Sequence, residues 1–186
     1  RQQTGPGFQF ENPNLTAEKS NTLELGTRLR WDFVRVDLFG FYTQLQDAIV
    51  KAPRSIENCP EAADGCATSW SQLQLVNTQG TSTVYGAEAS LIARTNVGLD
   101  FRATLSYTFG ESPDVLNTDL FVPISRIPPL NGTAEVHYRF FQNWKVGTAL
   151  RWAAAQTRLA PADLNDMTRI PMGGTPGFAI FDLRIS

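Results

Sequence analysis

Apolar and polar residues alternate with a period of two over long stretches of this 186-residue chain, and this alternation most constrains the fold. From Leu99 to Phe109, odd-numbered positions carry Leu, Phe, Ala, Leu, Tyr and Phe, whereas even-numbered positions carry Asp, Arg, Thr, Ser and Thr. Successive side chains of a β-strand point to opposite faces, so each such stretch predicts a strand with one apolar and one polar face. Six further stretches predict strands in the same way: 21–30, 34–50, 71–93, 134–140, 144–152 and 177–186.

The connections between these predicted strands alternate between short and long. Short connections cover 31–33, 95–97 and 141–143, whereas long ones cover 51–70, 111–126 and 157–175 and hold most of the Pro, Asp and Asn residues. This arrangement is typical of outer-membrane barrels, which have tight periplasmic turns and long external loops. Aromatic residues flank the short turns where an interfacial girdle would lie, although aromatic residues also favour strands in general. They are Trp31, Phe33, Phe140, Phe141 and Trp144.

The composition is compatible with a protein that spans a membrane through strands. No window approaches the roughly 20 apolar residues of a transmembrane helix, and charged residues make up only 18% of the chain. We therefore predict an all-β fold, an antiparallel transmembrane β-barrel segment of about seven strands. Because about seven strands do not close a bacterial barrel, we expect the chain to be a fragment of a longer, exported protein. The net charge of −2 offers no basic stripe and argues against a nucleic-acid partner.

Several motifs resemble those of TonB-dependent receptors, in that family's order along nearly the whole chain. The segment NPNLTAEKS resembles the NPNL box and the strand after it, and VYGAEA resembles the G-x-E strand that follows a long external loop. The segments RIPP and GGTPG are similar to loop-to-strand transitions near the family's C-terminal end. The matching residues are Asn12, Pro13, Asn14, Leu15, Glu18, Gly86, Glu88, Pro128, Gly174, Pro176 and Gly177.

The resemblance implies a location in the outer membrane of a Gram-negative cell, in contact with lipid and lipopolysaccharide. It implies a barrel of about 22 strands that encloses a plug. It also implies a non-enzymatic transporter without a cofactor, energised by the TonB complex through an N-terminal region. The ligand would be a scarce nutrient such as a ferric siderophore, haem or another iron source, and it would bind at the long loops. The GTPG segment is most similar to the haemoglobin and transferrin branch. We expect neither the plug nor the TonB box within these 186 residues.

Two other classes of protein stay open at this point. A passive porin or an autotransporter barrel would share the alternation and the turns, but would lack the NPNL box and a plug. A soluble all-β binding module, such as a lectin-like sandwich, would pack its apolar face on a second sheet and would dissolve without detergent.

Few residues suggest chemistry of their own. Cys59 and Cys66 lie in one long connection of an exported chain, where a disulfide is favoured over a metal site because no further nitrogen or sulfur ligands lie nearby. His137 alone does not assemble a catalytic triad, and we interpret it as a polar residue of the interior face. The loop carboxylates match no regular calcium spacing, so we interpret them as solvated. They are Glu111, Asp114, Asp119, Asp163 and Asp166.

Many charged residues fall on the predicted polar faces of the strands. They would line the barrel interior, where they could pair with a plug or simply keep the interior hydrated by pairing across strands. The set comprises Arg28, Arg30, Arg35, Asp37, Glu88, Arg102, Glu135, Arg139, Lys145, Arg151, Asp182 and Arg184.

Overall fold

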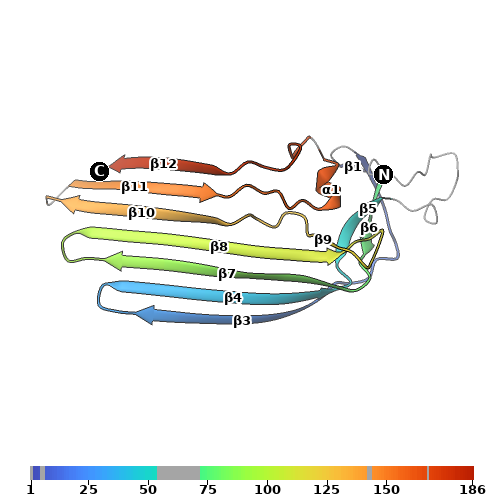
Figure 1. Cartoon of the computed structure of the whole chain (residues 1–186), viewed down its shortest axis with the longest axis horizontal. Coiled ribbons are helices and arrows are strands. Elements are labelled where there is room, and N and C mark those ends of the chain that lie inside the picture. The colour runs from blue at the N-terminus through green and yellow to red at the C-terminus, as the bar shows by residue number, and fades with distance from the viewer. Residues whose placement is uncertain (1, 5–6, 54–71, 142–143, 167) are drawn as a thin grey trace.

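Seven long strands form one antiparallel sheet in which each long strand pairs with the next one along the chain (Figure 1). The computed structural model describes residues 2–4, 7–53, 72–141, 144–166 and 168–186. The strand order confirms the predicted all-β architecture of about seven strands. The strands are β3 (Lys19–Arg30), β4 (Val34–Gln46), β7 (Thr81–Arg94), β8 (Leu99–Pro113), β10 (Asn131–Phe140), β11 (Trp144–Ala153) and β12 (Phe178–Ile185).

The short turns lie at one end of this sheet and the long connections at the other (Figure 1). The turn between β3 and β4 closes with a hydrogen bond from Trp31 N to Val34 O at 2.8 Å. The turn between β7 and β8 closes with one from Thr95 N to Leu99 O at 2.9 Å. The predicted segregation of connections is therefore confirmed. We call the two ends the short-turn end and the long-connection end.

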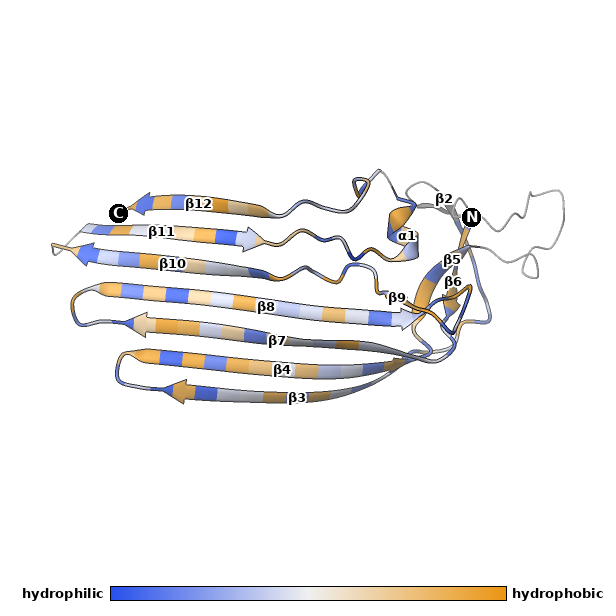
Figure 2. Ribbon diagram, in the orientation of Figure 1, coloured by the Kyte–Doolittle hydropathy of each residue, from blue (hydrophilic) through white to orange (hydrophobic). Residues whose placement is uncertain are grey.

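The register gives the sheet one apolar and one polar face, as the hydropathy colouring shows (Figure 2). Residues that are partners across neighbouring strands lie on the same face of the sheet. A row of such partners across β7, β8, β10 and β11 therefore shows the character of one face, and the adjacent row shows that of the other. The apolar row is Leu91, Ala103, Ala134 and Leu150. The polar row beside it is Ser90, Thr104, Thr133 and Arg151.

Large side chains of the apolar face are exposed. Leu25 is 80% exposed and Phe181 74%, and no second sheet covers this face within the part of the chain that the structure describes. Burying one such side chain is worth about 1.5–3 kcal/mol, so an uncovered apolar face is stable only against lipid or another apolar partner. The soluble sandwich predicts a covering sheet, which is not seen here.

Aromatic residues mark both ends of the apolar face. Trp31 is 57% exposed at the short-turn end, and Tyr85 stacks on Phe109 with ring centroids 5.0 Å apart toward the other end. Val34, which accepts the hydrogen bond of Trp31 across the turn, and Tyr42, the partner of Tyr85, are eight positions apart. Eight positions correspond to about 27 Å along a strand. Once the strand is tilted, that length suits an apolar band about 25 Å tall.

A second, smaller sheet lies at the long-connection end (Figure 1). Its strand order is β1-β2-β6-β5, in which β2 and β6 run parallel. The predicted strands 34–50 and 71–93 are therefore wrong in one respect, because each is divided between the two sheets. The small sheet comprises β1 (Gln2–Thr4), β2 (Gly7–Phe10), β5 (Ile49–Pro53) and β6 (Gln72–Asn77).

Both divisions occur where the backbone turns sharply. Asp47 has a φ of 57° and Gly80 a φ of 103°, which lie in the left-handed region that interrupts a strand. The two interruptions lie side by side, because Thr78 N donates to Ala48 O at 2.8 Å. The backbone groups released from the large sheet are thus paired again between β5 and β6.

The other long connections also contain regular structure. The strand β9 (Phe121–Pro123) folds back on the end of β8, and the short helix α1 (Pro161–Leu164) lies between β11 and β12. A bridge between Gln156 and Thr175 closes the base of this last connection. In the described residues, no helix has the length and apolar character needed to cross a membrane.

Candidate functional site: a pocket at the long-connection end

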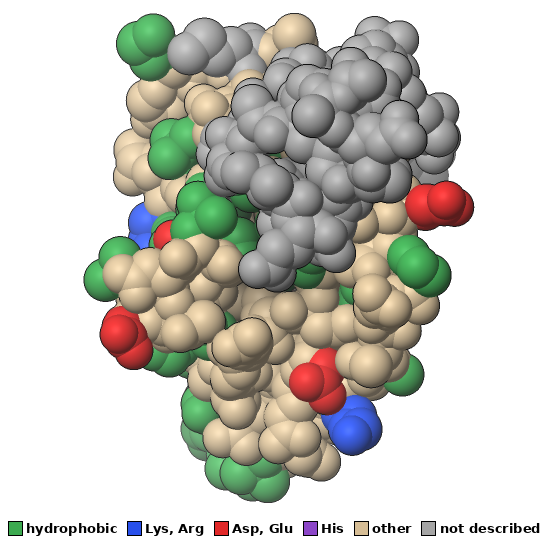
Figure 3. Space-filling model, turned by 90° about the vertical axis from the view of Figure 1, so that its right-hand side faces the viewer, with side chains coloured by type: hydrophobic (Ala, Val, Ile, Leu, Met, Phe, Trp, Pro, Cys, Tyr) green, Lys and Arg blue, Asp and Glu red, His purple; other side chains and the backbone are tan. Residues whose placement is uncertain are grey.

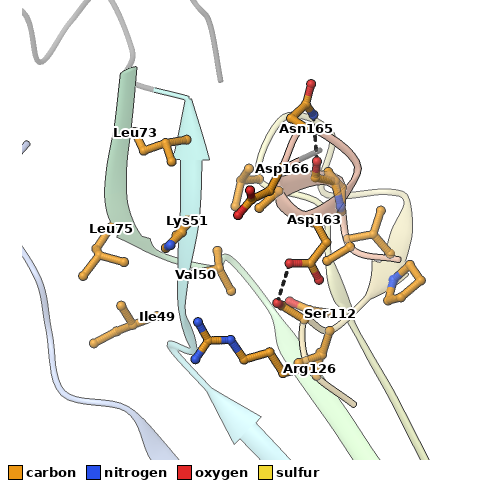
Figure 4. A pocket seen from close by; sticks show the side chains of 18 of the residues that line it. Ile49, Val50, Lys51, Leu73, Leu75, Ser112, Arg126, Asp163, Asn165 and Asp166 are labelled. Atoms are coloured by element: carbon orange, nitrogen blue, oxygen red, sulfur yellow. Dashed lines mark hydrogen bonds between the residues drawn. The ribbon is translucent and has the colours of Figure 1, made fainter. Parts of the chain in front are cut away.

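A pocket of about 350 Å³ lies where β5, β6, the β8–β9 hairpin and α1 meet (Figure 4). This volume lies within the range of roughly 300–1,000 Å³ that is typical of small-molecule sites. The pocket is lined by residues of all three long connections, which is where the sequence predicts ligand contacts. Four further lining residues belong to the small sheet and had been assigned to the barrel strands. They are Ile49, Val50, Leu73 and Leu75.

The pocket opens on the polar face of the large sheet. Its lining residue Ser112 lies on the same face of β8 as Thr104 and Ser106, an even number of residues away. Ser82 Oγ of β7 donates to Ser112 Oγ at 2.9 Å, and Ser82 is fully buried. Figure 3 looks onto this end of the molecule, where hydrophobic side chains lie mainly along the margins of the view.

Part of the pocket lining is apolar. Val50 and Leu73 contribute from the small sheet, and Val122 and Ile124 contribute from β9 and the residue after it. Ile124 is held in place because its backbone N donates to Gly110 O at 3.2 Å. A ligand with apolar surface would therefore find a partner here.

The α1 connection contributes charged groups to the lining. Asp166 is 2% exposed, accepts a hydrogen bond from Thr168 Oγ1 at 2.7 Å and forms an ion pair with Arg169. The hydrogen bond from Thr168 and the Arg169 guanidinium lower the pKa of Asp166 below its ordinary value of 3.8. Asp163 is 8% exposed and accepts a hydrogen bond from Ser125 Oγ at 2.9 Å. The interpretation of Asp163 and Asp166 as solvated carboxylates is therefore wrong, because neighbouring donors hold both of them inside.

Two cations of the pocket are not matched in this way. Lys51 and Arg126 form no ion pair with any residue that the structure describes. Arg126 has a φ of 65°, and its side chain extends from the segment after β9 toward β5, which carries Lys51 (Figure 4). With Asp166 neutralised by Arg169, the formal charges of Lys51, Arg126 and Asp163 leave the pocket net positive.

The motif at residues 12–18 fixes the small sheet that forms one side of this pocket. Asn12 Nδ2 donates to Leu75 O at 2.8 Å, and Glu18 Oε1 accepts from Ile49 N at 2.6 Å. Asn14 N donates to Asn12 Oδ1 at 3.0 Å, which forms a local turn around Pro13, with Leu15 following. The box thus positions β5 and β6 through hydrogen bonds and does not line the pocket itself.

Gly86 and Glu88 lie within β7, away from the pocket lining. Gly86 is directly opposite Phe41, and a Cβ at residue 86 would lie only 2.4 Å from Tyr107 O and 2.8 Å from Phe41 Cε1. Only glycine allows this close approach. Glu88 lies on the polar face, paired in register with Phe39 and Ser106.

The remaining motif residues lie in or next to the lining of a second cavity of about 340 Å³, which adjoins the first. Pro176 lines it, and Pro128 and Gly177 directly adjoin lining residues. Gln156 Nε2 closes this region by donating to Ile127 O at 2.5 Å. Gly174 has a φ of 106° and lies against Gln156 O, so a side chain there would be strained. Three residues line both cavities and separate them: Arg126, Asp163 and Arg169.

Other predicted features lie elsewhere. His137 pairs in register with Asp100 and Gly147 on the polar face near the short-turn end, as expected. Cys59 and Cys66 fall outside the described residues, so their disulfide stays a prediction. Among the residues that the structure does describe, no group of three or more His, Cys, Asp or Glu could hold a metal ion.

Comparison with protein families gives a match over almost the whole chain. A family model described as TonB dependent receptor-like, beta-barrel matches residues 2–186. This match includes every element of both sheets.

Solved structures share this fold at low sequence identity. The copper transporter OprC has a TM-score of 0.70 at 21% identity, over 93% of this chain and 23% of its own. The FrpB iron transporter from Neisseria meningitidis, F3-3 variant, has a TM-score of 0.62 at 17% identity, over 96% of this chain and 26% of its own. The siderophore receptor PirA from Acinetobacter baumannii has a TM-score of 0.61 at 17% identity, over 90% of this chain and 25% of its own. The chain therefore spans about a quarter of the length of each of these structures.

Proposed function

Because the chain belongs to the β-barrel family of TonB-dependent receptors, which lie in the outer membrane, we propose that it forms part of the wall of an active transporter for a scarce nutrient. The proposal extends to the whole receptor: a barrel of about 22 strands around a plug, embedded in lipid and lipopolysaccharide and energised by the TonB complex. These 186 residues would contribute seven of the strands and three external connections.

The pocket at the long-connection end is the observation that carries this proposal. Long connections of outer-membrane barrels face the outside of the cell, so a pocket there meets ligands before they enter the barrel. It lies on the polar face, which is the face that lines the interior of such barrels. This position supports capture of a ligand from outside followed by passage inward.

The lining supports a compact anionic ligand that also has apolar surface, such as a ferric siderophore or another iron chelate. Lys51 and Arg126 supply positive charge without a counter-ion among the described residues, and Val50 and Leu73 supply an apolar surface beside them. Haem stays a prediction for the ligand. The similarity to the haemoglobin and transferrin branch stays a prediction.

Removing the two unmatched cations tests this function in the full-length receptor. We expect Lys51→Ala with Arg126→Ala to lower binding of an anionic ferric chelate tenfold or more, because a hydrogen bond to a charged group contributes about 1.5–3 kcal/mol. Binding and uptake of radiolabelled iron would be measured in cells that carry each receptor variant. Lys19→Ala is the matched control, since Lys19 is a cation near the same end of the sheet that lines neither cavity.

Dependence on energy separates the active transporter from a passive porin. Uptake should saturate with ligand concentration and should be lost when the TonB complex is deleted. Uptake that is unsaturable and unaffected by this deletion would contradict the proposal and support a passive barrel.

A further inference from the structure

The strand β5 lies at one edge of the small sheet and borders the pocket. The order of this sheet is β1-β2-β6-β5, so β5 pairs with β6 on one side and with no strand of the described chain on its other side. That other side, which we call the free edge, faces the α1 connection across the pocket (Figure 4). Ile49, Val50 and Lys51 all line the pocket, although consecutive side chains of a strand point to opposite faces. Lining residues from both faces place the free edge itself at the pocket.

The register shows which backbone groups of β5 bond to β6. In an antiparallel pair, every second residue directs both its N–H and its C=O toward the partner strand. Thr78 N donates to Ala48 O at 2.8 Å, and this pair continues the register of β5 and β6. Val50 and Ala52 therefore direct their backbone groups toward β6, in line with Ala48. The backbone groups of Lys51, between them, point to the free edge.

The contacts of Ile49 agree with this assignment. Ile49 N donates to Glu18 Oε1 at 2.6 Å and not to β6. The carbonyl of Ile49 and both backbone groups of Lys51 have no hydrogen-bond partner within the described chain. The free edge thus presents one donor between two acceptors beside a pocket. An extended peptide pairs with such an edge by adding a strand to the sheet.

The charges of the lining indicate what kind of peptide fits. Lys51 and Arg126 form no ion pair with any described residue, and Val50 adds apolar surface next to them. A lysine on an edge strand discourages pairing with basic or apolar segments, so the partner that fits carries acidic side chains. A segment that bonds to all three groups of the free edge needs about three residues, or about 10 Å. That length suits a pocket of about 350 Å³ and does not require a folded partner.

We propose that the ligand of this pocket is built on a short peptide backbone with acidic side chains, and that it joins the small sheet as a fifth strand beside β5. The inference rests on the proposed function, because it specifies the chemical class of ligand for the same pocket. Charge attracts the ligand to Lys51 and Arg126, whereas backbone hydrogen bonds to the free edge select an extended peptide over other anions of similar size.

Binding of synthetic peptides to the full-length receptor in detergent tests the backbone contact. The probe is a fluorescently labelled pentapeptide of alternating Asp and Val, and its binding is measured by fluorescence anisotropy. Two N-methylated forms keep every side chain but lose the amide donors of one edge of the peptide or of the other edge. Because only one edge of the peptide can face β5, we expect one form to bind tenfold or more weakly than the other. Equal binding of the two forms, or no binding of the unmethylated probe at millimolar concentration, would overturn the proposal.

Two variants at residue 51 separate the backbone contact from the charge. Lys51→Ala and Lys51→Pro both lose the ammonium group, but only the proline variant loses the amide on the free edge. The pairing with β6 is retained, since this amide does not bond to β6, and proline is tolerated at such positions of edge strands. We expect the proline variant to bind the probe about threefold to tenfold more weakly than the alanine variant, as the loss of one hydrogen bond predicts.

Hydrogen exchange at Thr78, whose amide bonds to Ala48 O, reports whether the small sheet is intact in both variants. Equal affinity of the two variants for the probe would overturn the proposal.

Uptake of a ferric chelate is a separate readout. A receptor that takes up the chelate in a TonB-dependent manner but does not distinguish the two N-methylated probes would contradict this inference and leave the proposed function intact. Binding that does distinguish these probes, in a receptor without saturable and TonB-dependent uptake, would contradict the proposed function and leave this inference intact.

Discussion

Asn77 Nδ2 donates to the backbone carbonyl of Asp47 at 2.6 Å, which joins the two points at which the chain leaves the large sheet for the small one. Asn77 also accepts from Thr16 N at 2.8 Å and donates to Thr16 O at 3.0 Å. One side chain therefore connects the end of β6, the turn after β4 and the segment that follows the NPNL box. The orientation of the small sheet, and with it one wall of the pocket, depends on this contact.

Replacing Asn77 by Ala should loosen the small sheet while the large one persists. The variant loses three hydrogen bonds, each of which contributes about 0.5–1.5 kcal/mol. Hydrogen exchange should therefore accelerate at Ile49 and Thr78, whose amides are bonded at this junction. Asn96→Ala is the matched control, because Asn96 lies in a short turn at the other end of the sheet. Equal effects of the two substitutions would contradict the assigned role of Asn77.

Replacing Gly86 by Ala should destabilise the large sheet. The added Cβ would lie 2.4 Å from Tyr107 O, so the β7–β8 backbone would have to move apart. Overpacking of this kind costs about 1–3 kcal/mol, which should appear as a lower midpoint of unfolding in detergent. Gly40→Ala is a sharp control, because the nearest atom to its added Cβ is Gly86 O at 3.8 Å. A Gly86→Ala barrel as stable as the Gly40→Ala one would contradict the close approach.

The α1 connection should loosen in acid. Because the folded state lowers the pKa of Asp166 below 3.8, ionised Asp166 stabilises this connection above that value, and the contribution is lost as pH falls through the lowered pKa. Amides of Arg169 and Ile170 donate to Asp166 O, so their exchange, corrected for intrinsic rates, reports on the loss. In Asp166→Asn this pH dependence should vanish, whereas Asp119→Asn, at an exposed loop carboxylate, should retain it. Exchange that is independent of pH in the unmodified receptor would refute the assignment.

A new charge should destabilise the sheet much more on its apolar face than on its polar face. Ala103→Arg places a guanidinium group against lipid and should cost about 2–4 kcal/mol near the bilayer midplane. Thr104→Arg, one residue further along β8, points to the polar face and should lose little beyond the hydrogen bond of Thr104 Oγ1 to Thr133 Oγ1. Unfolding of both variants in detergent or lipid vesicles measures the difference. A larger loss for Thr104→Arg would reverse the assigned faces.

The strands and their faces could be predicted because the alternation is local. Residues 99–109 alternate without interruption, and β8 runs from Leu99 to Pro113. The divisions at Asp47 and Gly80 were missed because apolar residues continue on both sides of each turn, as Ile49 and Val50 do after Asp47. A signal was present in Asn77-Thr78-Gln79-Gly80, whose residue types favour a turn.

The sequence predicted where the pocket lies, but not which side chains surround the charged groups in it. The three long connections that line it were identified by length and composition, whereas Asp163 was misread because its donor Ser125 lies 38 residues away in another long connection. For Asp166 a local signal was present, because its partners Thr168 and Arg169 lie within three residues of it.

The sequence by itself determined the seven long strands of the large sheet, its two faces and the placement of short and long connections, because a period of two and turn-forming residues act over a few neighbouring positions. Only the tertiary structure decided that β5 and β6 leave the large sheet for a smaller one, and that Asn77 holds the junction between the two sheets. Those features depend on strand register and on contacts between residues that are distant in the sequence. The free energy of the whole folded chain, not of any local segment, decides which of these contacts form.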